Sequence, residues 1–166
     1  MGDRTPLGMA AEDRVAYLLA GRFALIVALV GEDRRPYATR GWSLTVLPGR
    51  PAQVRLVLGS DDGPALQGGQ GSRPIALTAA DPLTLRAVQF KGRAGPVELA
   101  TADDQVAVAR FCESFFGVVE ELEGTDRRLL ERMIPDDFVA CTVVIDELYD
   151  QTPGPGAGAA LSGGSP

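Results

Sequence analysis

The chain contains no histidine among its 166 residues. Histidine is the usual general base, the usual partner of a nucleophilic serine or cysteine, and the commonest metal ligand. Its absence therefore argues against hydrolase and metalloenzyme functions. If the protein performs chemistry, a bound organic cofactor is the expected source of reactivity.

Cysteine is scarce as well, with Cys112 in a helical pattern and Cys141 in a strand pattern. Two cysteines make a poor disulfide framework for a chain of this size. Without histidine they also leave a structural zinc site short of ligands. We expect both to be buried free thiols.

Long apolar runs and clustered cationic residues are missing too. No apolar stretch reaches the roughly 18 to 20 residues that a membrane span needs, and the N-terminus lacks the features of a secretory signal. These absences predict a mature, cytoplasmic protein. The net charge of −6 argues against binding to nucleic acid or anionic membrane, because both depend on clustered Lys and Arg. Only a local basic pocket could bind an anion.

The composition is that of one packed domain, with 45% hydrophobic residues in a chain too short for two ordinary domains. Hydrophobic spacing and turn residues predict three helices and six strands. The helices are expected at residues 10–20, 101–122 and 126–133. The strands are expected at residues 22–30, 36–47, 54–59, 74–78, 83–99 and 138–148. Short turns between successive strands favour an antiparallel barrel with peripheral helices.

Several local signals add detail to this prediction. Gly92 interrupts the strand at 83–99 and permits a bulge or bend. Thr101 and Asp104 form a plausible capping box at the start of the long helix. The domain is expected to span residues 1–150. The Pro- and Gly-rich segment 151–166 cannot build a core and is expected to be a partly disordered tail, with 152–157 in an extended path.

Two segments carry a resemblance to a known family. Arg86-Ala87-Val88-Gln89-Phe90-Lys91-Gly92-Arg93 resembles a strand of the pyridoxamine 5'-phosphate oxidase-like flavoproteins that reads roughly Arg-Gln-Val-Arg-aliphatic-Glu-Gly. Pro36-Tyr37-Ala38-Thr39-Arg40-Gly41-Trp42 resembles that family's early strand, in which an arginine near a proline helps to hold the flavin phosphate. The likeness covers about residues 10 to 150.

The resemblance implies a six-stranded antiparallel split β-barrel, a homodimer, and an FMN site at the subunit interface. Carried over by position, Arg40 would contact the phosphate, and Arg86 and Gln89 lie on the strand that faces the cofactor. Trp42 could stack on the flavin ring, or it could be a core or interface residue. Thr78 is a further candidate on the neighbouring strand, although its hydroxyl could instead serve only the backbone.

Two departures from the family pattern bear on the cofactor. Ala87 stands where the family has glutamine, and Gly59-Ser60-Asp61-Asp62-Gly63 replaces the usual Ser-Arg-Lys phosphate segment. Carboxylates close to a dianionic phosphate would repel it. Three functions therefore stay open: an FMN-dependent oxidoreductase of unknown substrate, a cofactor-free homodimeric binding protein, or a protein that uses the deazaflavin F420 or haem. The lack of histidine disfavours ordinary haem ligation.

Overall fold

A computed structural model describes residues 11–20, 22–31, 35–49, 52–67 and 73–161. These residues form one antiparallel sheet of eight strands in the order β2-β1-β5-β6-β8-β4-β3, with β7 paired to β8. The strands are β1 (Ala24–Val30), β2 (Pro36–Arg40), β3 (Ser43–Leu47), β4 (Gln53–Gly59), β5 (Arg73–Ala80), β6 (Ala87–Ala94), β7 (Glu98–Leu99) and β8 (Phe138–Asp150).

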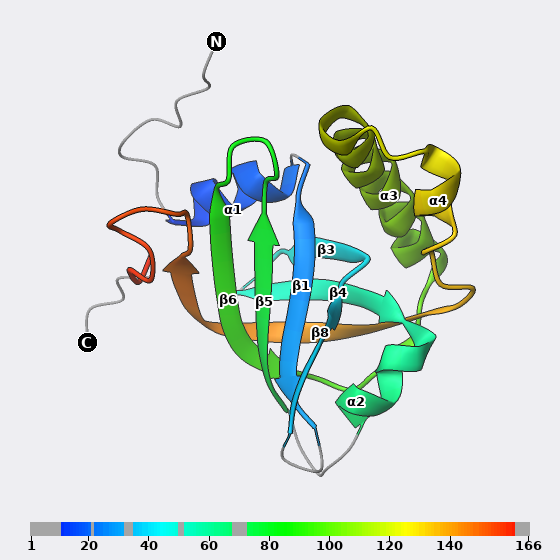
Figure 1. The fold of residues 1–166 in the computed structure, drawn as a ribbon. Coiled ribbons are helices and arrows are strands. Elements are labelled where there is room, and N and C mark those ends of the chain that lie inside the picture. Colours follow the sequence, from blue (N-terminus) through cyan, green and yellow to red (C-terminus); the bar gives the residue numbers. More distant parts are fainter. Residues whose placement is uncertain (1–10, 21, 32–34, 50–51, 68–72, 162–166) are drawn as a thin grey trace.

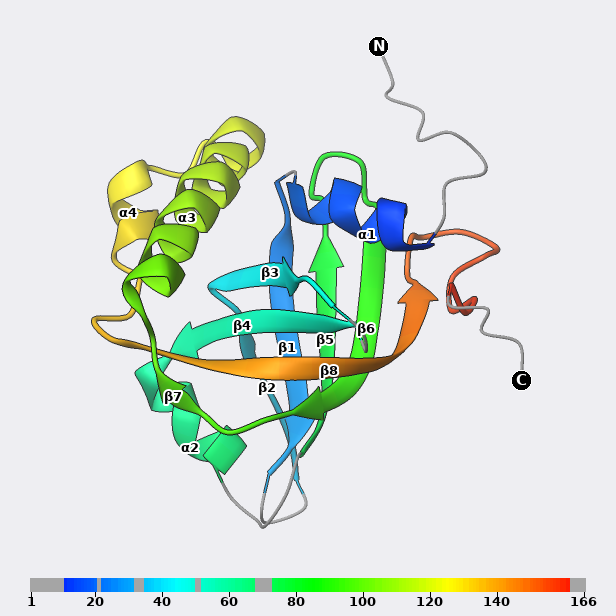
Figure 2. The same cartoon turned by 180° about the vertical axis from the view of Figure 1, so that it is seen from behind.

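The sheet curls so that β1, β5 and β6 form one layer and β8, β4 and β3 cross behind it (Figure 1; Figure 2). Its largest fully buried side chains lie on strands of both layers, among them Leu25, Leu77, Leu56 and Leu58. The predicted antiparallel split barrel is therefore confirmed. The strand number differs because the predicted strands at 36–47 and 83–99 each divide into two.

The first division occurs at Gly41 and Trp42, where the chain passes from one layer to the other. The Gly41 N–H donates to the Leu25 carbonyl at 3.0 Å, whereas the Trp42 N–H donates to the Val57 carbonyl at 2.9 Å. A Cβ at Gly41 would lie 2.3 Å from Leu25 Cδ2, which is far inside van der Waals contact. The corner therefore requires glycine, and β2 and β3 are separate strands.

The predicted irregularity at Gly92 is confirmed as a β-bulge against β8. The register shifts between Lys91, which pairs with Glu147, and Gly92, which pairs with Ile145. Asp146 is thus the extra residue on β8. A Cβ at Gly92 would lie 2.0 Å from the Val144 carbonyl oxygen. The two backbones approach this closely only because position 92 has no side chain.

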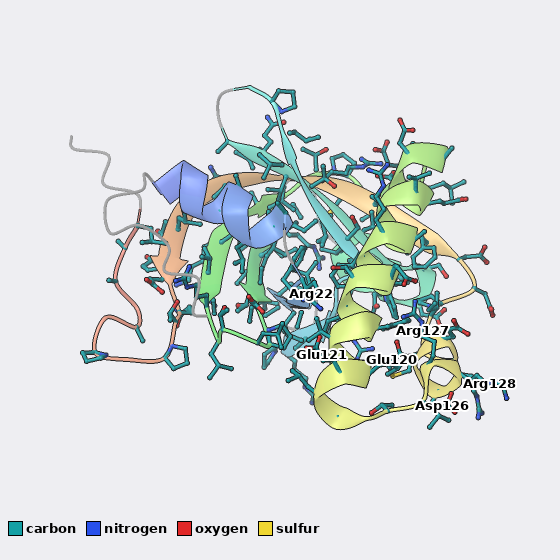
Figure 3. All side chains as sticks on the ribbon, turned by 90° about the horizontal axis from the view of Figure 1, so that it is seen from above. Arg22, Glu120, Glu121, Asp126, Arg127 and Arg128 are labelled. Atoms are coloured by element: carbon teal, nitrogen blue, oxygen red, sulfur yellow. The ribbon has the colours of Figure 1, made fainter. Side chains whose placement is uncertain are left out.

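The helices are α1 (Ala11–Ala20), the 3-10 turn η1 (Ser60–Asp62), α2 (Gly63–Gln67), α3 (Ala102–Glu123) and α4 (Arg127–Glu131). The predicted capping box is confirmed, because the Asp104 N–H donates to Thr101 Oγ1 and the Thr101 N–H donates to the Asp104 carboxylate. Both α1 and α3 lie at the same end of the barrel (Figure 1). Figure 3 shows Arg22 and Glu121 at this end, where they form an ion pair at 3.2 Å.

Residues 151–161 fold back on the sheet rather than continuing away from it. The Gln151 N–H donates to the Ala87 carbonyl at 2.8 Å, and the Leu161 N–H donates to the Leu148 carbonyl at 2.7 Å. Turns and bends occupy 152–158, so the predicted extended path at 152–157 is wrong, because closely spaced Gly and Pro favour turns. Residues 162–166, the end of the predicted disordered tail, lie outside the described residues.

Among the described helices, none combines the length and the apolar character needed to cross a bilayer.

Candidate functional site

Thr78 and Gln89 are neighbours on adjacent strands and interact directly. They are paired in the β5–β6 register, and Gln89 Nε2 donates to Thr78 Oγ1 at 3.3 Å. Both side chains are partly exposed. Because directly paired residues point to the same face of a sheet, the two form one small polar patch. The structure thus brings together two of the predicted site residues.

Arg40 lies on the same face, in the same row of paired residues. The row continues from Thr78 to Ile26 on β1 and from Ile26 to Arg40 on β2. This face is the outside of the barrel, since Ile26 is 50% exposed while Leu25 and Val27 are at most 1% exposed. Arg40 and Gln89 are three strand spacings apart, which is about 14 Å.

A surface of small apolar residues extends from this row. Ala38, Ala28 and Ala76 form the next row, and Val30 beyond them is 53% exposed. We call this surface the outer sheet face; it consists of Ile26, Ala28, Val30, Pro36, Ala38, Pro74, Ala76 and Thr78. A groove of about 440 Å³ occupies the part of it around Ala28, Val30 and Ala76 and is bordered by Lys91, Asp146 and Glu147; Ile26 and Thr78 do not line it. Exposed apolar patches of this kind mark interaction sites.

Polar side chains of β6 and β8 form the border of the outer sheet face. The Lys91 ammonium lies 4.6 Å from the centre of the Tyr149 ring, and the Tyr149 hydroxyl donates to Glu147 at 2.5 Å. This hydrogen bond raises the pKa of Tyr149. Sequence reasoning missed the contact among these three side chains, and its local signal was the two-residue spacing of Glu147 and Tyr149, which places both on one face of a strand.

The Arg40 guanidinium contacts only weak partners. It lies 5.7 Å from the centre of the Trp42 ring and 3.7 Å from the Met133 sulfur. Within the described ranges it forms no ion pair with a carboxylate. Most of its five N–H donors are therefore available to an anion.

Trp42 belongs to the core. It is 4% exposed and packs edge-on against Phe138, with ring centres 6.3 Å apart. Arg40 lies over its ring. The structure therefore places Trp42 beneath Arg40 as a packing residue and does not bring it to the Thr78–Gln89 patch.

Arg86 also lies away from the patch. It precedes β6, and its carbonyl accepts from the Asp81 N–H at 2.8 Å in the turn between β5 and β6. Gln89 is three positions further along the chain, a span of about 10 Å along a strand. The next residue, Ala87, is buried, and its N–H donates to Thr152 Oγ1 at 3.2 Å. The C-terminal segment thus covers the start of this strand.

The carboxylate of Asp62 does not share a face with Arg40. It accepts from the Tyr37 hydroxyl at 2.5 Å and from Thr39 Oγ1 at 3.0 Å. Tyr37 and Thr39 alternate with Arg40 along β2 and so point to the opposite side of the strand. The hydrogen bond to Asp62 raises the pKa of Tyr37. Tyr37 and Thr39 therefore hold the Asp62 carboxylate on the side of β2 opposite to the outer sheet face.

Neither cysteine forms part of a reactive centre. Cys112 and Cys141 are buried free thiols, as predicted, and burial raises the pKa of each to about 11. At neutral pH both are protonated. The part of the chain that the structure describes also contains no cluster of three or more residues able to hold a metal ion.

Comparison with known proteins identifies similar folds but no sequence family. No protein-family model and no curated protein matches the chain. A solved structure of HupZ from Group A Streptococcus is similar, with 14% identity, a TM-score of 0.50, and coverage of 88% of this chain and 98% of that chain. At this identity the similarity shows the fold alone.

Two further solved structures are similar at lower TM-scores. A pyridoxamine 5'-phosphate oxidase-related, FMN-binding protein from Nostoc punctiforme has 15% identity and a TM-score of 0.46, and the match covers 90% of this chain and 88% of that chain. HutZ, the haem storage protein from Vibrio cholerae, has 12% identity and a TM-score of 0.45, and the match covers 86% and 95%. The description of the Nostoc protein relates it to pyridoxamine 5'-phosphate oxidase, whose family the sequence resembles.

Proposed function

We propose that this chain is a homodimeric oxidoreductase that binds FMN at the outer sheet face. The observation that supports this most directly is the sheet register, which lines up a cation at Arg40, an apolar side chain at Ile26 and the polar pair Thr78–Gln89 in one row. A flavin needs these three features in this order: a cation for the phosphate, an apolar surface for the ring, and polar partners for its pyrimidine edge.

Thr78 and Gln89 would orient the ring. Gln89 uses one amide N–H on Thr78, so its carbonyl oxygen and second N–H remain for the donor and acceptor atoms of a flavin pyrimidine. Ile26 and Ala28 lie beside this pair on the flat outer sheet face and would contact an aromatic ring. When bound, the flavin would supply the electron transfer, while these residues hold it and exclude water from one side.

Arg40 would hold the phosphate. Its donors suit a phosphate group geometrically, and about 14 Å is a reasonable span from the ring contacts to the end of a ribityl phosphate chain. A single arginine would then face the dianionic phosphate. The segment between Gly59 and Gly63, which stands where the family has Ser-Arg-Lys, contains no lysine or arginine. We expect an affinity lower than that of a site with several cations.

The homodimer would form through the same outer sheet face. A second copy would cover Ile26 and Val30, which are half exposed in the single chain. Lys91 and Glu147 border the groove on this face. In a two-fold arrangement, Lys91 of one copy can face Glu147 of the other, so the surface is complementary to itself. Dimerisation would also cover the proposed flavin site, which lies beside this groove.

A cofactor-free homodimer is the second candidate. Arg40 as a single cation would hold a flavin phosphate weakly, and Trp42 is buried and so is not placed to stack on a flavin ring. Both observations favour the cofactor-free homodimer. Haem is a weaker candidate, because the chain has no histidine and both cysteine thiols are buried, which removes the common axial ligands. F420 is anionic like FMN and would need the same arginine.

The deciding experiment is the visible absorption spectrum of the purified protein, before and after incubation with FMN, F420 or haem and subsequent desalting. A retained flavin band near one FMN per chain supports the proposal. Retention of haem or F420 in its place would overturn the FMN assignment. If no chromophore is retained while light scattering gives a dimer, the cofactor-free candidate stands.

A further inference from the structure

A cavity of about 420 Å³ lies between α1, β3 and α3. This volume is within the usual range for small-molecule sites. The cavity is at the end of the barrel where both helices lie (Figure 3). Its lining includes none of the residues Arg40, Thr78 and Gln89, so it is separate from the proposed flavin site.

The apolar wall of this cavity is aromatic. Phe23 and Phe111 both line it and pack edge-to-face, with ring centres 5.3 Å apart. Leu44 completes this side. All three are buried, so the wall is fixed by the core. Phe111 also stacks on Phe115, with ring centres 5.8 Å apart, so a ligand ring would contact the small part of Phe23 and Phe111 that the core leaves uncovered.

Ser43 places an unused hydroxyl at the cavity. The residue is 4% exposed and lines the cavity, yet its side chain forms no hydrogen bond within the described part of the chain. Among the described residues the buried side-chain N or O atom that lacks a partner is Arg127 Nε, so the Ser43 hydroxyl is open to the cavity and can bond to water or to a ligand there. Ser114 of α3 lines the same cavity and likewise has no hydrogen-bond partner among the described side chains.

Arg110 of α3 contributes a cation to the lining. It has no carboxylate partner among the described residues. It also borders an adjoining depression that contains Glu98, Asp103 and Asp104. Glu98 and Asp104 are bound to Arg55 instead, and Asp103 is exposed. Arg110 is therefore available to an anion at the mouth of the cavity.

We infer that this cavity binds a small aromatic carboxylate. The ring would lie against Phe23 and Phe111, the carboxylate would accept from Arg110, and the hydroxyls of Ser43 and Ser114 would donate to its oxygen atoms. The inference does not depend on flavin binding, because the two sites share no lining residue.

The test uses 2-naphthoate as the probe, with the full-length protein and the fluorescence of the naphthoate as the signal. We expect saturable binding at micromolar to millimolar concentration, and weaker binding of the neutral 2-naphthamide. Arg110→Ala should weaken naphthoate binding about tenfold, the loss expected for one charge-assisted hydrogen bond, and should leave naphthamide binding unchanged. Ser43→Ala should weaken naphthoate binding severalfold.

Arg132→Ala is the matched control, because Arg132 is an exposed arginine outside the cavity lining; it should bind naphthoate like the unmodified chain. Absence of saturable binding would overturn the inference. Equal binding by the Arg110→Ala variant would overturn it as well, and tighter binding of octanoate than of naphthoate would overturn the aromatic specificity.

Discussion

Arg55 binds Asp104 through two parallel hydrogen bonds, from Nε to Oδ1 at 3.0 Å and from Nη2 to Oδ2 at 2.7 Å. The pair joins the middle of β4 to the first turn of α3. Both side chains are largely buried, at 15% and 7% exposure. Asp104 is also the capping-box residue of α3. One carboxylate therefore fixes both the start of the helix and its attachment to the barrel.

Asp104→Asn should lower the free energy of unfolding by about 3 kcal/mol at neutral pH, because it leaves the Arg55 guanidinium without its buried charge partner. Asp103→Asn is the control, since Asp103 is exposed on the same turn, and it should change stability by less than about 0.5 kcal/mol. Urea denaturation measures both. Equal effects of the two substitutions would show that the pair does not stabilise the fold.

The same pair predicts a pH dependence. Hydrogen bonding to Arg55 lowers the pKa of Asp104 from 3.8 to about 2. A depressed folded-state pKa stabilises the protein above the unfolded-state pKa, and the contribution is lost as the pH falls toward 2. The difference in unfolding free energy between the unmodified chain and Asp104→Asn should therefore shrink by about 2 kcal/mol between pH 5 and pH 2. A difference independent of pH would contradict this.

Arg40→Ala should lower FMN affinity by at least about tenfold, because a charge-assisted hydrogen bond contributes about 1.5 to 3 kcal/mol. The fold should persist, since within the described ranges the side-chain contacts of Arg40 are the weak ones to Trp42 and Met133. Quenching of flavin fluorescence measures the affinity, and Arg132→Ala serves as the control. Unchanged affinity in Arg40→Ala would remove Arg40 from the phosphate site.

Ile26→Glu should convert the proposed dimer to a folded monomer. Ile26 is 50% exposed in the single chain, so glutamate is tolerated there, but it would place a like-charged pair within a two-fold interface. Leu129→Glu, at a position 55% exposed on α4, should remain dimeric. Light scattering at micromolar concentration gives the mass. A monomeric unmodified chain would refute the homodimer, and a dimeric Ile26→Glu variant would place the interface elsewhere.

Leu85→Asn should stabilise the protein by about 0.5 to 1 kcal/mol. Leu85 has a φ of 58°, a left-handed conformation that asparagine adopts more readily than leucine. The side chain is 60% exposed, so little burial is lost. Leu83→Asn in the same turn lacks the unusual φ and should give no gain. A Leu85→Asn variant less stable than the parent in thermal denaturation would disprove this explanation.

The parts of the fold that depend on local chemistry could be predicted from the sequence. The Thr101–Asp104 capping box is encoded within four residues, and Gly92 signals the bulge by itself. The break at Gly41 was missed because β-type composition continues through Trp42, whereas the corner depends on hydrogen bonds from Gly41 to Leu25, 16 positions earlier, and from Trp42 to Val57. The division of 36–47 into two strands is thus a tertiary effect.

The candidate site was predictable in its residue types but not in its arrangement. Arg40, Thr78 and Gln89 come from three separate strands, and only the sheet register places them in one row. Trp42 could not be assigned to the core from the sequence, because its environment depends on Phe138, nearly 100 positions later. The Arg55–Asp104 pair was missed for the same reason.

The passage of the chain at Gly41 and Trp42 also determines how the sheet can open. β2 and β3 are the two ends of the strand order, yet only two residues separate them along the chain. The two edge strands are not neighbours in the described sheet, and the covalent connection through Gly41 and Trp42 joins them. To unroll, the sheet must first release Gly41 from Leu25 or Trp42 from Val57. The amide protons of these two residues thus report on opening of the barrel, because they hold the corner at which its two edge strands meet.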